Sequence, residues 1–145
     1  MFKSLFKKKQ ETEIKEVDKK ITAITSLLVE AALIDEDFGT SEKEVIISVI
    51  RKQFKINDEN QIKKMIDEAV TEIKESGDLV SHTRVIKENW PLKERISVIE
   101  MLWKVCLVDG VIEPYEDMLI RRIAGLIYVS DKERNLAKKK VMDFN

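Results

Sequence analysis

The stretch LWKVCLVDGVIEPYEDMLIRRIAGLIYVSD, from Leu102 to Asp131, decides the fold of this chain. It begins with apolar residues at helical spacing, passes through an acidic segment around Asp109, and resumes helical spacing after Pro114. Proline suits the first turn of a helix because its fixed φ is already helical and its missing N–H is not needed there. Ser130 then offers the side chain of an N-cap. The stretch therefore predicts a helix, an acidic loop, a second helix and the start of a third.

A related pattern occurs earlier in the chain. LIDEDFGTSEKEVI, Leu33 to Ile46, aligns with LVDGVIEPYEDMLI, Leu107 to Ile120, at a constant offset of 74 positions. Both copies contain hydrophobic-hydrophobic-Asp-x-x-hydrophobic-x-x-x-Glu, and FKIND at 54–58 aligns with IYVSD at 127–131 after a one-residue slip. Two copies are too few for a solenoid. We therefore predict a degenerate internal two-fold helix–acidic loop–helix repeat that packs about a pseudo-two-fold axis into one core.

Helical spacing of apolar residues covers nearly the whole chain. Ile24, Leu28 and Ala31, for example, follow steps of four and three, which is typical of a helix with one face toward a core. The single Asp-Gly dipeptide lies between helical patterns, so no β-hairpin is expected. We predict an all-α single domain of about seven helices, near residues 12–34, 41–54, 58–76, 79–89, 91–108, 114–127 and 131–144.

Capping patterns set some of these boundaries. Ser41 and Glu44 have the spacing of a capping box, and Asn57 is a favourable N-cap. Residues 12–145 are expected to form the helical domain. Residues 1–11 are expected to be a flexible, basic and amphipathic N-terminal segment.

Composition and charge exclude several classes of protein. The 145 residues carry 26 basic and 27 acidic side chains, a formal net charge of -1, which predicts no nucleic-acid binding. No stretch approaches the roughly 20 apolar residues of a membrane span, and the N-terminus lacks the apolar core of a signal peptide. The single cysteine, Cys106, allows no disulfide within the chain and fits a reducing compartment. We therefore expect a cytoplasmic protein.

Residues with chemical potential are few, and we expect no enzyme. His82 is the only histidine and belongs to no catalytic motif, while Cys106 has the helical phase of a buried residue. The chain has no glycine-rich phosphate loop, no His-Glu-x-x-His and no Cys-x-x-Cys. Trp103 is expected to pack in the core. Trp90, beside a proline, either covers the edge of the core or forms part of a partner surface.

The chain resembles the TerB family of tellurite-resistance-type helical proteins. The resemblance is carried by LLVEAALIDEDF at 27–38 and by the stretch 102–131, and it extends from about Ile21 to about Lys138. In the second copy, Val108-Asp109-Gly110 is close to the family's Ala-Asp-Gly, whereas the first copy has no glycine after its aspartate. The resemblance implies an all-α, non-enzymatic protein of tellurite resistance and other stress responses. It also implies divalent-metal binding by acidic residues of the two loops.

Carboxylates in the two loops are the candidate metal ligands. Calcium and magnesium prefer such hard oxygen donors, and neither loop has the ligand spacing of an EF-hand. The same residues have a structural interpretation, since Asp often caps helix ends and Glu in a first turn is favoured by the helix dipole. Both interpretations stay open for the candidate ligands Asp35, Asp37, Glu42, Asp109, Glu113 and Glu116.

Two functional hypotheses follow. The first is a TerB-like stress-response module that binds a divalent cation, calcium or magnesium, or a protein partner through its acidic loops. The second is a protein-interaction or co-chaperone-type scaffold whose acidic residues are purely structural caps, because a related domain occurs in membrane-anchored J-domain co-chaperones. A minor hypothesis is a weak peripheral membrane contact through residues 1–9, which combine apolar and lysine side chains; a frayed or docked terminus is the competing interpretation.

Overall fold

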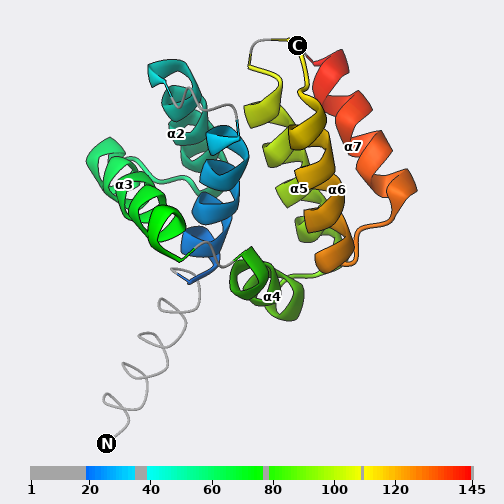
Figure 1. Cartoon of the computed structure of the whole chain (residues 1–145), viewed down its shortest axis with the longest axis horizontal. Helices are drawn as coiled ribbons and strands as arrows, with labels where there is room; N and C mark the ends of the chain where they lie inside the picture. Colours follow the sequence, from blue (N-terminus) through cyan, green and yellow to red (C-terminus); the bar gives the residue numbers. More distant parts are fainter. Residues whose placement is uncertain (1–18, 35–38, 77–78, 109, 145) are drawn as a thin grey trace, which may run out of the picture.

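The computed structural model describes residues 19–34, 39–76, 79–108 and 110–144. Within these residues the chain forms seven helices and no strand, so the predicted all-α fold is confirmed. None of the described helices has the length and apolar composition needed to cross a membrane. The first helix covers residues 19–33, and the others are α2 (Thr40–Phe54), α3 (Glu59–Glu75), α4 (Leu79–Asn89), α5 (Leu92–Cys106), α6 (Pro114–Leu126) and α7 (Asp131–Asp143) (Figure 1).

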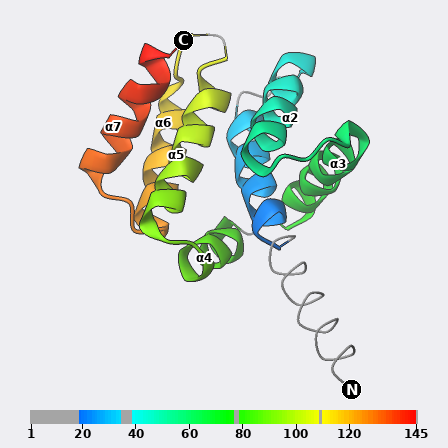
Figure 2. The same ribbon diagram turned by 180° about the vertical axis from the view of Figure 1, so that it is seen from behind.

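The helices pack as two groups with α4 across one end. The first helix, α2 and α3 form one group, and α5, α6 and α7 form the other (Figure 1). The groups meet where α2 contacts α5, and α4 packs against α6. Figure 2 shows the same arrangement from behind, with α4 at the end where the first helix begins. The first helix and α5 therefore both end away from α4.

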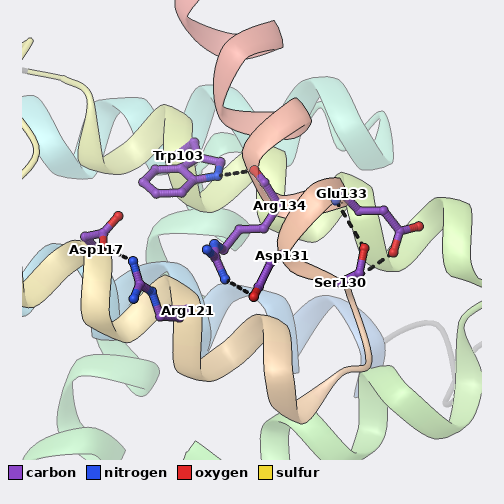
Figure 3. A network of polar contacts seen from close by, with 7 residues as sticks. All are labelled: Trp103, Asp117, Arg121, Ser130, Asp131, Glu133 and Arg134. Carbon is purple, nitrogen blue, oxygen red and sulfur yellow. Dashed lines mark hydrogen bonds and ion pairs between the residues drawn. The ribbon is translucent and has the colours of Figure 1, made fainter.

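Helix α5 is the centre of the core. It contacts α2, α6 and α7. It contributes more buried residues than α2, α3, α4, α6 or α7, and only the first helix contributes more. Trp103 is fully buried, and its indole N–H donates to the backbone carbonyl of Arg134 in α7 at 3.3 Å (Figure 3). Cys106 is 2% exposed, so both residues have the packing role that the sequence predicts. The buried residues of α5 are Val98, Ile99, Met101, Leu102, Trp103, Val105 and Cys106.

The start of α2 differs from the prediction. Gly39 is the N-cap, and the carboxylate of Glu42 accepts the Gly39 N–H at 3.1 Å. The predicted capping box of Ser41 and Glu44 is therefore wrong by two residues. The reason is that Glu42 can close back on a glycine N-cap without any help from a side chain at that position.

The start of α3 also differs by one residue. Asp58, and not Asn57, is the N-cap, and its carboxylate accepts the N–H groups of Asn60 and Gln61. A carboxylate has the advantage of charge at the positive end of a helix. The predicted N-cap at Ser130 is confirmed, because its hydroxyl accepts the Glu133 N–H at 3.2 Å.

The backbone conformation of two residues agrees with the predicted alignment of the two copies of the repeat. Lys55 (φ 54°) and Tyr128 (φ 57°) are the non-glycine residues with positive φ in the described part of the chain. They occupy equivalent places when FKIND is aligned with IYVSD, just after α2 and α6. The duplication stays a prediction, because Asp35 and Asp109, on which it depends, lie outside the described residues.

Other predictions also fall outside the described part. These are the N-terminal segment 1–11 with the membrane hypothesis for residues 1–9, the helical start at 12–18, and the candidate ligand Asp37.

We predict that Leu102→Ala lowers the free energy of unfolding by about 2–5 kcal/mol, because it leaves a cavity where α5 is fully enclosed. Leu136→Ala is the matched control, since Leu136 is 57% exposed on α7 and its truncation should change stability by no more than about 0.5 kcal/mol. Denaturant unfolding measures both. A cost at Leu102 no greater than at Leu136 would contradict the packing of α5.

Candidate functional site

The described residues that flank the two acidic loops lie at the same end of the molecule. The first helix ends and α2 begins there, and so do the end of α5 and the start of α6, at the top of Figures 1 and 2. Ile34, which follows the first helix, lines a surface depression together with Tyr115 and Met118 of α6. The two loop regions therefore share one surface, which we call the acidic-loop end.

Two of the candidate metal ligands hold the backbone of their own helix. Glu42 accepts the N–H of Gly39 at 3.1 Å, and Glu116 accepts the N–H of Glu113 at 3.0 Å. Each glutamate is the third residue of its helix, so its carboxylate also lies near the positive end of the helix dipole. Glu116 is only 6% exposed. These contacts support the structural interpretation for Glu42 and Glu116.

The other candidate ligands are placed only in part. Glu113 is exposed at the N-cap of α6, while Asp35, Asp37 and Asp109 lie outside the described residues. Among the residues with described positions, no three His, Cys, Asp or Glu side chains are grouped as a metal site would require. The six-residue ligand set therefore stays a prediction.

An exposed apolar cluster at this end was not predicted. Tyr115 and Met118, which line the depression together with Ile34, have exposed fractions of 72% and 63%, and we call them the α6 patch. Tyr115 and Met118 are three residues apart on α6 and so lie on one face of that helix. Their phase differs from that of the buried Ile120 and Ile123, which is the sequence signal that could have revealed them.

A polar cluster also forms around the single histidine. Nε2 of His82 in α4 lies 2.9 Å from Oε1 of Glu72 in α3, and the His82 side chain is only 15% exposed. Burial raises the pKa of the Glu30 carboxyl above its usual range, while His82 and Arg122 act in the opposite direction. His82 thus joins α4 to the preceding helix α3, a contact that no sequence motif predicts.

Comparison with known protein families shows which family the chain belongs to. The sequence profile of the family described as "Tellurite resistance protein TerB" matches residues 21–139. The chain belongs to the TerB family. The matched range includes both acidic loops and the α6 patch of this TerB domain. Neither the curated proteins nor the solved structures that were compared contain a match to it.

Helix α7 begins with the same kind of capping that is found at the starts of α2 and α6. Ser130 donates its N–H to the Glu133 carboxylate at 3.0 Å (Figure 3). Hydrogen bonding by the Ser130 backbone, and by its side chain, lowers the pKa of Glu133. Arg134, whose side chain is 8% exposed, pairs with Asp131 at 2.6 Å in the same turn. Glutamate at the third helical position is therefore a general capping device in this protein.

We predict that Glu116→Ala lowers the free energy of unfolding by about 1–3 kcal/mol, because it leaves the Glu113 N–H without its carboxylate partner. Glu44→Ala, at an exposed position of α2, is the control and should cost less than about 0.5 kcal/mol. Equal stability of the two variants in denaturant unfolding would refute the capping role.

We predict a pH-dependent gain of stability for Glu30→Gln. The folded-state pKa of Glu30 lies above its ordinary value of 4.5, so ionising this carboxyl costs stability as the pH rises through the interval between the two values. Gln carries no charge, so the variant should melt higher than the parent at neutral pH, and the difference should vanish below the ordinary pKa. Glu88→Gln, an exposed position of α4, is the control for loss of one negative charge. A lower melting temperature of Glu30→Gln at neutral pH would mean that attraction to His82 and Arg122 outweighs burial.

Proposed function

We propose that this TerB protein is a non-enzymatic stress-response module of the tellurite-resistance type that binds a basic partner protein at its acidic-loop end. The observation that carries the proposal is the α6 patch, two large and exposed side chains at the acidic-loop end. Exposed apolar clusters with a polar rim are typical of protein interaction sites, and tyrosine and methionine are enriched in interfaces.

The charges around the α6 patch favour a basic partner. Glu113 is exposed two residues before Tyr115, and the sequence places Asp35, Glu36 and Asp37 directly after Ile34, which lines the same depression as Tyr115. Arg122 is the charged residue among the described residues that line this depression. Complementary charge steers association and selects partners more than it adds affinity. The apolar side chains would therefore supply most of the binding energy, and the carboxylates the preference for lysine and arginine.

A divalent cation is the second candidate ligand of the same surface. What favours it is that the flanks of both acidic loops meet at one end of the body. Calcium requires six to eight oxygen ligands, and magnesium keeps several of its waters. Carboxylates from both loops would have to converge on one ion, with water completing its coordination.

The alternative proposal is a co-chaperone-type scaffold in which the acidic residues serve only as caps. The contacts of Glu42 and Glu116 with their own helix starts favour it. This alternative differs from the first proposal in one respect: partner binding would not depend on the aspartates of the loops.

We predict that Tyr115→Ser with Met118→Ser lowers partner recovery at least about tenfold in quantitative pull-downs from the cells of origin, equivalent to about 1.4 kcal/mol. Both residues are exposed, so the fold should be unaffected. Leu136→Ser with Met142→Ser is the matched control, because these side chains are 57% and 53% exposed on α7. Equal recovery with the two double variants would reject the α6 patch as the binding surface.

The double variant Asp35→Asn with Asp109→Asn distinguishes between the proposed partner surface and the scaffold alternative. Loss of partner recovery without a change in stability supports the acidic loops as part of the partner surface. Unchanged recovery with lowered stability supports the scaffold alternative. Calorimetric titration with calcium, magnesium and manganese tests the cation: heat that this variant abolishes supports it, and no heat with an unchanged melting temperature rejects it.

A further inference from the structure

A groove lies between α2, α5 and α7, and none of its lining residues belongs to the α6 patch. Its cavity volume is about 930 Å³. Apolar side chains from all three helices and their ends form much of the lining. They are Val45, Val49, Leu107, Val108, Val141 and Phe144. Phe144 is 83% exposed, so this apolar surface is in part uncovered.

Lysine side chains border the groove on three sides. Lys52 comes from α2, Lys104 from α5 and Lys140 from α7. Glu100 is the acidic residue among the described residues that line the groove, and it pairs with Lys140 at 3.3 Å. Neither Lys52 nor Lys104 forms an ion pair with another described residue.

This concentration of positive charge contrasts with the whole chain, whose formal net charge is -1. Lys52 and Lys104, which have no acidic partner among the residues that the structure describes, flank an apolar surface. This arrangement complements an apolar face bordered by carboxylates. Lysine can lay its aliphatic stem on apolar surface while its ammonium group meets such a carboxylate. The chain's own N-terminal segment does not fit this chemistry, because residues 1–9 carry lysines and no acidic residue.

We propose that this groove docks an acidic amphipathic helix of a partner protein. Its apolar face lies on the valines, Leu107 and Phe144, and its carboxylates meet Lys52 and Lys104. Helices that bind in grooves present apolar anchors at spacings of three, four and seven residues. This proposal goes beyond the proposed function, because the groove contains no residue of the α6 patch and its occupant is acidic rather than basic. The groove reaches the acidic-loop end only at Leu107, Val108 and Gly110.

Fluorescence polarisation with a labelled synthetic helix tests the proposal on the full chain. The probe is a peptide of about 16 residues with leucines at helical spacing on one face and glutamates on the rest. A scrambled peptide of the same composition is the probe control. We expect micromolar binding of the amphipathic peptide, and at least tenfold weaker binding of the scrambled one.

Charge reversal in the groove gives the decisive comparison. Lys52→Glu with Lys104→Glu should weaken peptide binding at least tenfold, whereas Lys63→Glu with Lys64→Glu on the exposed face of α3 makes the same change in net charge and should leave it intact. A peptide in which lysines replace the glutamates should bind the Lys52/Lys104 variant. A variant that had lost its fold would bind neither peptide. Phe144→Ala should weaken binding of the original peptide.

Three results would overturn the proposal. The first is equal binding of the amphipathic and scrambled peptides. The second is an equal loss in the two charge-reversed variants. The third is a dimer in sedimentation that the Lys52/Lys104 variant dissociates, because the occupant would then be a second copy of this chain. The Tyr115/Met118 variant should bind the peptide normally, so failure here is distinguishable from failure at the acidic-loop end.

Discussion

Helix α5 is enclosed by three other helices, and this enclosure holds the second group of helices together. This helix is apolar on more than one face, so it is stable only when α2, α6 and α7 all cover it. Two side chains of α5 tie it to α7 and to the end of α6 by hydrogen bonds, because Trp103 donates to the Arg134 carbonyl and Arg95 donates to the Ile127 carbonyl at 2.7 Å. Since α5 is held on these sides, the end of α5 and the start of α6 are fixed, and with them the position of the α6 patch.

Glutamates at the third position of a helix explain much of the acidic pattern in the loops without any ligand. Glu42, Glu116 and Glu133 each accept the N–H of the residue just before their helix. The same three-residue spacing in all three places shows that the device is local and independent of what the loops bind. Recognition by the acidic-loop end is then left to Glu113, the aspartates and the exposed apolar side chains.

The spacing of residues in the sequence was sufficient to predict the helices, the burial of Leu102 and Cys106, and the N-cap at Ser130. It failed at Gly39 and Asp58, because neighbouring residues compete for a cap whose contribution is only about 1 kcal/mol. It also missed the contact of His82 with Glu72, and the basic groove, because both combine side chains from separate helices. Such juxtapositions depend on how helices pack, and no short-range pattern encodes them.

Lys55 and Tyr128 have left-handed backbone conformations. They lie in the turns after α2 and after α6. A side chain in this conformation costs about 1–2 kcal/mol, so packing on both sides must hold it there. At Tyr128 part of that support is visible, because the ammonium group of Lys87 lies 4.8 Å from the centre of its ring. These two residues lie in the turns that lead into α3 and α7, away from the acidic loops. Those loops can accordingly vary in sequence, and so in what they recognise, while the scaffold behind them keeps its shape.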